Sequence, residues 1–450
     1  MNGTKTRSIN NSTPEVIRQE LEEVLRQGFV TRYGGGFLLI PYFQQLEIDK
    51  KIELLEINKT NGIPPIKICL AIMNHTAFNG KRLFHLENPS KNDPGLAVLS
   101  GLAKLPTDTV AHDSLNSIPI VYSDKFWEEC SKKFVQTGLI LGKRVILDKK
   151  FIPFWGKMEM RKDQHATRHI NMKGIDLFLT YDLNARCCIY KQEDYPGNKP
   201  GEVGILMLDK TDKIVEGKLE WAVMDKLFCI GELLDYLNRR LKIEFVTALK
   251  LYKKRIKEMK EIPVEQFRKM ADGRKITFIH TKYKDYNGKL RLVVIHFEEE
   301  GESKYYGYLT NDEQSSDELV LQGYNQRQNI ENFLDETSFL NLEKLPGIRL
   351  NEVSMMLSLK MIVFNIFSSF RRDLGGRYRH MEIESIYEKF LDNQAMVTTR
   401  GRKIKVTFFR HKMHDVVAPL YMNLSQQLER KNIDPRIPWF NNRTLEFEFK

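Results

Sequence analysis

The sequence predicts an α/β protein with a mixed sheet, a β-rich insertion within that sheet and an all-helical N-terminal domain before it. Three observations predict this class. Apolar residues repeat with helical spacing up to about residue 120 and with strand spacing from Lys143 onward. A strand, a helix and a second strand follow one another within residues 219–249, which indicates a parallel strand pair. After Tyr252 this alternation stops, and short strands separated by turn residues follow.

Composition and charge describe a folded protein with a basic surface. The 450 residues are 42% hydrophobic and 29% charged, which excludes collagen-like and wholly disordered chains. The five cysteines are odd in number and lack a paired C-x-x-C spacing, which argues against a disulfide framework and a zinc knuckle. The net charge of +11 favours a polyanionic partner without identifying it.

The apolar segments do not predict a membrane protein. The N-terminal residues lack the apolar stretch of a secretory signal, and we expect a cytoplasmic, nucleoid-associated protein. The longest apolar run, residues 353–370, is interrupted by Lys360 and Asn365. It therefore predicts a buried helix rather than a membrane span.

The N-terminal region, residues 1–140, has helical patterns throughout. A helix at residues 14–27 follows the cap Ser12-Thr13, and residues 94–116 predict two short helices. Two interpretations of this second segment stay open. It is either a helix-turn-helix whose His112, Ser114 and Asn116 contact DNA, or a helical hairpin that only packs.

The strands after Lys143 form the predicted sheet, and residues 141–251 are its first part. Residues 144–148 are an apolar run that ends at Asp148, and residues 174–181 and 186–190 predict two further strands in antiparallel order. Residues 219–225 are a second apolar run that ends at Asp225. A helix at residues 230–241 and a strand at 243–249 follow it.

The β-rich insertion is predicted at residues 252–322. Strands at residues 275–280 and 290–297 flank Asn287-Gly288, a strong signal for a tight hairpin turn. Helices resume at residues 323–337 and 353–372, so residues 323–375 form the second part of the sheet domain. Residues 376–450 are a basic C-terminal region.

Three carboxylates are candidates for chemistry. Asp148 and Asp225 end two strands, and Glu331 lies on a predicted helix where its spacing from Tyr324 and Arg327 puts all three side chains on one face. Taken singly, each acid is most often an ordinary solvated carboxylate. Together, three carboxylates with little nitrogen or sulfur nearby suit Mg²⁺ rather than zinc.

The residues around these acids resemble a known family. The string from Tyr324 through Arg327 to Glu331 is similar to the Y-x2-R-x3-E signature of insertion-sequence DDE transposases. The resemblance extends to the runs that end at Asp148 and Asp225 and to Phe228, and it covers residues 140–375. It implies a ribonuclease H-like catalytic domain, with the insertion between Asp225 and Glu331.

The resemblance also implies an activity, a cofactor and a partner. Asp148, Asp225 and Glu331 would hold two Mg²⁺ ions, for which Mn²⁺ can substitute, and would cut and transfer DNA strands at the ends of a mobile element. Arg327 and Tyr324 would hold the phosphate backbone. The partner would be double-stranded DNA, both transposon ends and target, with a homodimer on DNA as one arrangement and no membrane role.

Basic residues near these motifs are further candidates for DNA contacts. They are Lys150, Arg371, Arg372, Arg377 and Arg379. Strand alternation puts Lys150 on the same face as Asp148, so its ammonium reaches either a catalytic carboxylate or DNA phosphate. The histidine pairs His165/His169 and His411/His414 lack a third convergent ligand and do not predict a metal site.

Three positions depart from the family pattern. Ser338 stands where the family has a lysine, Leu227 stands in a turn that usually contains glycine, and Lys149-Lys150 follow Asp148 where small or hydroxyl residues are more usual. These departures keep two alternatives to an active transposase open. One is a catalytically impaired DNA-binding derivative, and the other is a nuclease of the same fold that does not join strands.

Overall fold

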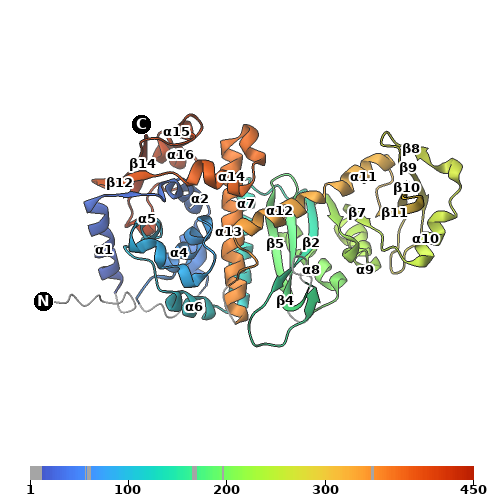
Figure 1. Ribbon diagram of the computed structural model, residues 1–450, viewed down its shortest axis with the longest axis horizontal. Coiled ribbons are helices and arrows are strands. Elements are labelled where there is room, and N and C mark those ends of the chain that lie inside the picture. Colours follow the sequence, from blue (N-terminus) through green and yellow to red (C-terminus); the bar gives the residue numbers. More distant parts are fainter. Residues whose placement is uncertain (1–12, 56, 58–61, 165–169, 195–196, 346–348) are drawn as a thin grey trace. The chain divides into compact units, whose positions relative to one another are not determined.

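The computed structural model describes residues 13–55, 57, 62–164, 170–194, 197–345 and 349–450 (Figure 1). The chain forms two compact units, and each one interrupts the other in sequence. The helical unit comprises Met1–Leu139, Phe154–Glu159 and Asp335–Lys450, and the sheet unit comprises Ile140–Pro153 and Met160–Leu334. The five segments expected from the sequence are thus distributed over two units, and the N-terminal region shares its unit with the C-terminal region.

The sheet unit is built on one ten-stranded mixed sheet. Its strands, in spatial order, are β3 (Lys162–Gln164), β4 (Asn171–Asp182), β2 (Arg144–Pro153), β6 (Trp221–Met224), β7 (Glu244–Ala248), β11 (Glu302–Thr310), β10 (Arg291–Glu299), β9 (Lys275–His280) and β8 (Arg268–Lys269), with β5 (Cys187–Asp194) paired to β4. β2, β6 and β7 run parallel, and the other neighbours are antiparallel. The predicted antiparallel order of the first three main strands and the parallel strand pair are confirmed.

Helices flank this sheet. They are α8 (Pro200–Ile214), α9 (Gly231–Asp235) with a π-helical turn (Tyr236–Leu241), α10 (Lys253–Lys260), α11 (Asp317–Asn325) and α12 (Gln328–Phe339). α8 packs against β4 and β5, where the Thr211 hydroxyl lies 2.7 Å from that of Thr180. Buried apolar residues of α8 thereby cover strands that are themselves buried.

The β-rich segment extends the same sheet. β11 pairs with β7, and β9 and β10 are antiparallel, as expected. The tight turn predicted at Asn287-Gly288 is wrong, because residues 281–290 form a longer connection in which the Asn287 amide donates to Asp235 at 2.9 Å. The two-residue turn lies instead at Glu300-Gly301, where both φ angles are positive (52° and 81°), between β10 and β11.

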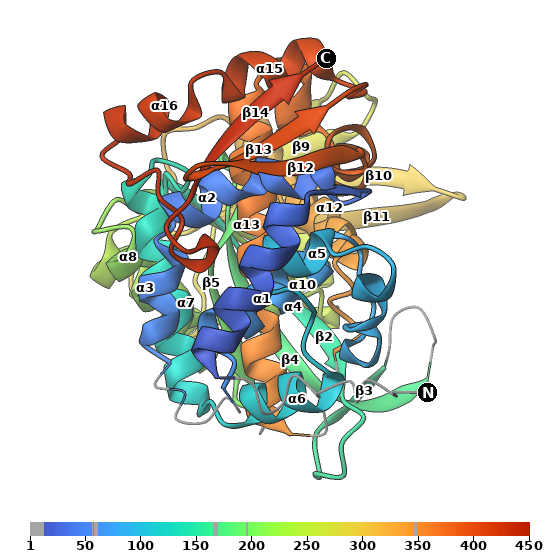
Figure 2. The same cartoon turned by 90° about the vertical axis from the view of Figure 1, so that its left-hand side faces the viewer.

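The helical unit combines eleven helices within the described residues with a small sheet. The helices are α1 (Pro14–Gln27), α2 (Ile40–Gln45), α3 (Ile48–Glu53), α4 (Pro65–Ala77), α5 (Gly95–Leu99), α6 (Asp108–Asn116), α7 (Ile120–Gln136), α13 (Leu350–Leu374), α14 (Ile383–Ile386), α15 (His414–Tyr421) and α16 (Leu424–Arg430). The sheet has the order β1 (Phe29–Thr31), β12 (Ala395–Arg400), β13 (Lys403–Phe408) and β14 (Thr444–Phe449). Figure 2 shows β12, β13 and β14 side by side with α15 and α16 near β14.

The small sheet corrects the expectation of an all-helical N-terminal domain. α1 has the predicted bounds and is capped by the Thr13 side chain, while Ser12 lies outside the described residues. The helix ends at Gly28, whose φ of 69° turns the chain, and β1 then pairs with β12 in register Val30 to Met396. Phe29, Val30 and Thr31 are strand-favouring residues whose distant partner the local pattern cannot reveal.

α13 is the buried helix that the sequence predicts. It is long and apolar enough to cross a membrane, but its apolar window is wholly buried inside the protein. Its polar residues are satisfied internally: the Lys360 ammonium donates to the carbonyls of Leu340 and Asn341, both at 2.8 Å, and the hydroxyls of Ser358 and Ser123 lie 3.0 Å apart. These bonds explain why a lysine lies within an apolar helix.

Of the two interpretations of residues 94–116, the contacts of His112, Ser114 and Asn116 favour the helical hairpin over the helix-turn-helix. The His112 ring bonds Glu352 of α13, and Ser114 is buried with its hydroxyl donating to the Val110 carbonyl at 2.7 Å. The Asn116 carbonyl accepts from Asn351 at 3.2 Å. These side chains and backbone groups pack α6 against α13, which favours the helical hairpin.

We expect Asp182→Ala to destabilise the sheet unit by on the order of 3 kcal/mol or more. The fully buried Asp182 carboxylate accepts four backbone amides, from Leu141, Gly142, Asn184 and Ala185, at 2.7–3.0 Å. Urea unfolding followed by circular dichroism measures the loss. Asp209→Ala, which removes a partly exposed ion pair with Lys213, should cost under about 1 kcal/mol. Equal effects of the two changes would contradict this account.

Candidate active site

Two aspartates meet where the parallel pairing of β2 and β6 ends. Leu147 pairs with Met224, and Asp148 and Asp225 are the residues that follow them. Adjacent strands lie about 4.8 Å apart, so the two carboxylates come from neighbouring backbone positions. Asp148 is 9% exposed and Asp225 is half-buried.

The sequence suggested that Asp148 ends its strand, but in the structure it does not. β2 continues to Pro153 because its pairing with β4 continues. Asp148 pairs with Leu179, and the last pair is Pro153 with Gly174. β6 does end before Asp225. A 3-10 turn over Lys226–Phe228 follows it, closed by the Phe228 amide bonding the Asp225 carbonyl at 2.9 Å. Leu227 lies in this turn, and the buried Phe228 ring packs against Phe178.

The helix predicted at residues 323–337 is in fact two helices. Tyr324 is in α11, Glu331 is in α12, and Arg327 lies in the turn between them, where its amide bonds the Tyr324 carbonyl at 2.9 Å. The argument from a single helical face was therefore wrong in its geometry. Arg327 and Glu331 are nevertheless in contact, since the Arg327 guanidinium bonds the Glu331 carboxylate.

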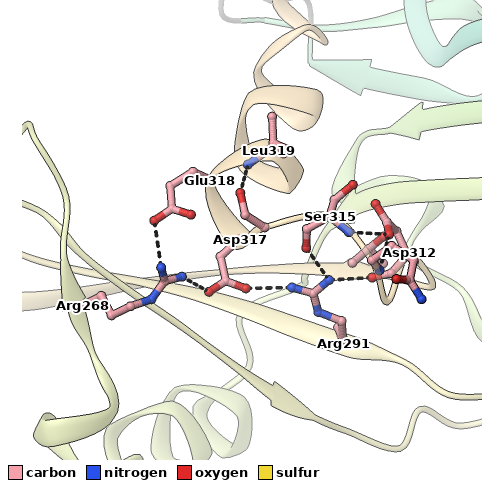
Figure 3. A network of polar contacts seen from close by, with 10 residues as sticks. Arg268, Arg291, Asp312, Ser315, Asp317, Glu318 and Leu319 are labelled. Atoms are coloured by element: carbon pink, nitrogen blue, oxygen red, sulfur yellow. Dashed lines mark hydrogen bonds and ion pairs between the residues drawn. The ribbon is translucent and has the colours of Figure 1, made fainter.

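A buried polar network fixes the start of α11 (Figure 3). Asp317, 3% exposed, accepts from Arg268 at 2.6 Å and from Arg291 at 2.8 Å. Arg291 also donates to the carbonyls of Asp312 and Ser315, at 2.7 and 2.9 Å. The first turn of the helix that carries Tyr324 is thus tied to β8 and β10.

Arg327 links two of the three candidate carboxylates. Its Nη1 lies 3.0 Å from Asp148 Oδ2, and its Nη2 bonds Glu331 Oε1. Only 21% of the Arg327 side chain is exposed, whereas Glu331 is half exposed. Arg327 therefore holds the carboxylate of the sheet and that of α12 close to one positive charge.

Burial and charge set the acidity of this group. The pKa of Asp148 is raised to about 6, mainly by burial and to a smaller extent by the carboxylates of Asp225 and Glu331, while the Lys149 amide and the Arg327 charge lower it. Burial also raises the pKa of Tyr324 to about 12, and its ring packs 4.6 Å from that of Tyr308. Asp148 therefore titrates close to neutral pH.

The donor set suits a hard cation, although the described residues contain no group of three acidic, histidine or cysteine side chains already arranged to hold a metal. Three carboxylates, one nearly buried and one solvent-facing, are the oxygen ligands that Mg²⁺ prefers. Arg327 supplies the compensating charge between Asp148 and Glu331. His411 bonds the Phe390 carbonyl, and His165 and His169 lie outside the described residues.

The lysines after Asp148 point in different directions. Lys150 donates to the Leu334 carbonyl of α12 at 3.2 Å, and Lys149 pairs with Asp176 at 3.0 Å. Ser338, on the same helix, is exposed. The sequence did not point to Thr247 of β7, whose hydroxyl donates to the Asp225 carbonyl at 3.2 Å. Only the strand register places Thr247 near the site, because Thr247 pairs with Met224, the residue before Asp225.

The four arginines predicted to bind DNA behave differently from one another. Arg371 is a correction: it is 1% exposed, pairs with Glu336 at 2.6 Å and donates to the Met381 carbonyl, so it holds α13 in place and cannot reach a phosphate. Arg372 pairs with Asp373 at 3.1 Å, and Arg377 lies over the Tyr378 ring. Arg377 and Arg379 are exposed.

Comparisons relate the chain to known proteins. The family model for the transposase DDE domain matches residues 141–366, half of the chain. No curated protein matches. Among solved structures, the cryo-EM structure of the piggyBac transposase synaptic complex with hairpin DNA is similar over 86% of this chain and 82% of that chain, with 14% identity and a TM-score of 0.46.

We expect Arg327→Gln to raise the pKa of Asp148 above its value of about 6, because the change removes the cation nearest to that carboxylate. Carbon-13 NMR of labelled aspartate carboxyls measures the titration, with Asp148→Asn identifying the signal. Arg274→Gln, which removes the partner of the exposed Asp272, should leave it unchanged. An unaltered titration in Arg327→Gln would show that the contact has no electrostatic effect.

Proposed function

Because the match over half of its length shows that the chain belongs to the transposase DDE domain family, we propose that it cuts DNA at the ends of a mobile element and joins the ends to new sites. The observation that carries this proposal is the pairing of Leu147 with Met224, which brings Asp148 and Asp225 together, with Arg327 linking Asp148 to Glu331. The similarity of Tyr324, Arg327 and Glu331 to the Y-x2-R-x3-E signature supports it.

Asp148, Asp225 and Glu331 are the residues that would hold two Mg²⁺ ions. When bound, such ions activate an attacking hydroxyl and stabilise the leaving oxygen of an in-line displacement at phosphorus. Asp148 has to be ionised for this role, and the Arg327 charge favours that state. The Lys149 amide, 2.7 Å from Asp148 Oδ1, holds the other side of the carboxylate.

Arg327 has a second role in this proposal. Its guanidinium, which bonds Asp148 and Glu331, would donate to DNA phosphate when the carboxylates hold cations instead, and its planar fork is suited to that contact. Half-buried Tyr324 positions the backbone beside it. Double-stranded DNA is the substrate, a homodimer on DNA pairs the two element ends, and the protein acts at the nucleoid.

The first test changes each carboxylate to its amide. Asp148→Asn, Asp225→Asn and Glu331→Gln should each abolish Mg²⁺-dependent cleavage of DNA that carries the element's ends, because neutral amides do not hold the cations. The combined losses should be non-additive, since the three act as a unit. The matched control is Asp209→Asn, an acid paired with Lys213 outside the site, which should cleave normally.

Two outcomes decide between the alternatives. Full cleavage in any one of the three amide variants would remove that residue from the site. Wild-type protein that binds the end DNA but never cleaves it, with Mg²⁺ or Mn²⁺, would leave only the DNA-binding derivative. Cleavage without joining would indicate a nuclease.

The second test is pH dependence. A proton on Asp148 competes with Mg²⁺, so Mg²⁺ affinity of the free protein should be constant above pH 7 and fall about tenfold per pH unit below 6. Titration calorimetry at pH 5, 6 and 7.5 measures it. The Asp148→Asn variant should bind weakly and without this slope. A wild-type affinity that does not change between pH 7.5 and 5 would exclude Asp148 as a ligand.

A further inference from the structure

The hairpin of β12 and β13 has a narrow basic tip. Arg400 pairs with Lys403, so only Gly401 and Arg402 form the turn. Gly401 has a φ of 60° and Arg402 has a negative φ, the combination of a two-residue turn with glycine at its first central position. A Cβ atom built on Gly401 would meet no other atom within 4 Å, so the side-chain face of this glycine is open.

The tip carries two uncompensated arginines. Arg400 and Arg402 are both exposed, and among the residues that the structure describes neither has an ion-pair partner. Lys403, by contrast, pairs with Glu446 at 2.8 Å. The pair at the tip is therefore free to neutralise an external anion.

Hydrogen bonds hold the backbone of the tip in place, although the two arginine side chains make no ion pair among the described residues. Arg443 donates to the Gly401 carbonyl and is itself held by Glu22 of α1. The Thr444 amide donates to the Arg402 carbonyl at 3.1 Å, and the Thr399 hydroxyl donates to the Leu25 carbonyl at 3.2 Å. A tip fixed before binding loses less conformational entropy on binding.

We propose that Arg400-Gly401-Arg402 enters the minor groove of A·T-rich double-stranded DNA. The two guanidinium groups of the tip carry only hydrogen-bond donors, and the floor of the minor groove at A·T pairs offers only acceptors, whereas G·C pairs add a donor there. Narrow A·T tracts also have enhanced negative potential that attracts arginine. Gly401, without a side chain, lets the turn approach a groove only about 6 Å wide.

The sheet itself argues for entry by the tip rather than for a ribbon lying flat in the major groove. The face that carries Lys403 and Lys405 also carries Glu446 and Glu448, which pair with them at 2.8 and 3.1 Å. A flat ribbon would bring these carboxylates against DNA. The inference rests on the proposed function for its DNA substrate, and it adds the groove, the base composition and the residues that read it.

The test compares three duplexes of equal length whose central tracts are A·T, I·C or G·C. I·C pairs have the minor-groove pattern of A·T pairs but a different major groove. The full-length protein should bind the A·T and I·C duplexes equally in fluorescence anisotropy, and the G·C duplex more weakly. Arg400→Ala and Arg402→Ala should each weaken A·T binding by roughly 5- to 100-fold, and the double variant should lose the preference.

The matched control is Arg430→Ala, an exposed arginine at the end of α16, which should keep both affinity and preference. Thermal unfolding of the tip variants should match the wild type, because the changed side chains make no ion pair. A double variant with wild-type preference, a wild-type protein that distinguishes A·T from I·C, or equal binding of all three duplexes would overturn the inference. Cleavage of end DNA is scored separately, so loss of the groove preference in a cleaving protein refutes only this inference.

Discussion

The parallel pairing of β2 with β6 is the constraint on which the candidate site depends. Leu147 and Met224 are register partners, and this single alignment brings Asp148 and Asp225 to adjacent positions although 76 residues separate them in the chain. A slip of one residue would turn Asp148 to the opposite face of the sheet, away from Arg327. The apolar residues Val145, Ile146 and Leu147 are fully buried on both faces of β2, so a slip would also disrupt core packing, and the energetic cost of that disruption holds the two aspartates in register.

Arg327 resolves the electrostatic problem that this pairing creates. Burial is the main cause that raises the pKa of Asp148 to about 6, and the nearby carboxylates of Asp225 and Glu331 add to it. The Arg327 guanidinium, in contact with Asp148, lowers this pKa and so favours the ionised form that the proposed cation site needs. If the carboxylates hold cations as proposed, these cations compete with Arg327 for Asp148 and Glu331. In that proposal the displaced guanidinium is then available to a phosphate, so cation binding and DNA binding are linked through one side chain.

Local pattern was sufficient for elements whose signals are local. The bounds of α1, the burial of α13 and the parallel pair β6 and β7 follow from caps, apolar spacing and the strand-helix-strand order. Features created by distant partners could not be predicted. The charged residues Lys149 and Lys150 suggested that β2 ends at Asp148, but its pairing with β4 extends it to Pro153. The break at Arg327 and the pairing of β1 with β12 likewise depend on contacts remote in sequence. For the site, the residue types were predictable and the Arg327 bridge was not.

Charge in the sequence does not show which basic residues can meet an external anion, and the arginines of the helical unit show why. Arg371 lies near three other arginines in residues 371–379, yet it is buried against Glu336, which neutralises its charge inside the protein. Counterion release counts only cations that meet phosphate, so a paired arginine contributes little to affinity. Arg400 and Arg402 lie in a segment that also contains Lys403 and Lys405, and the glycine between the two arginines forms a turn that leaves both guanidiniums exposed and unpaired among the described residues. Pairing and backbone conformation, and not only cation density, therefore determine which basic residues are available to an external anion.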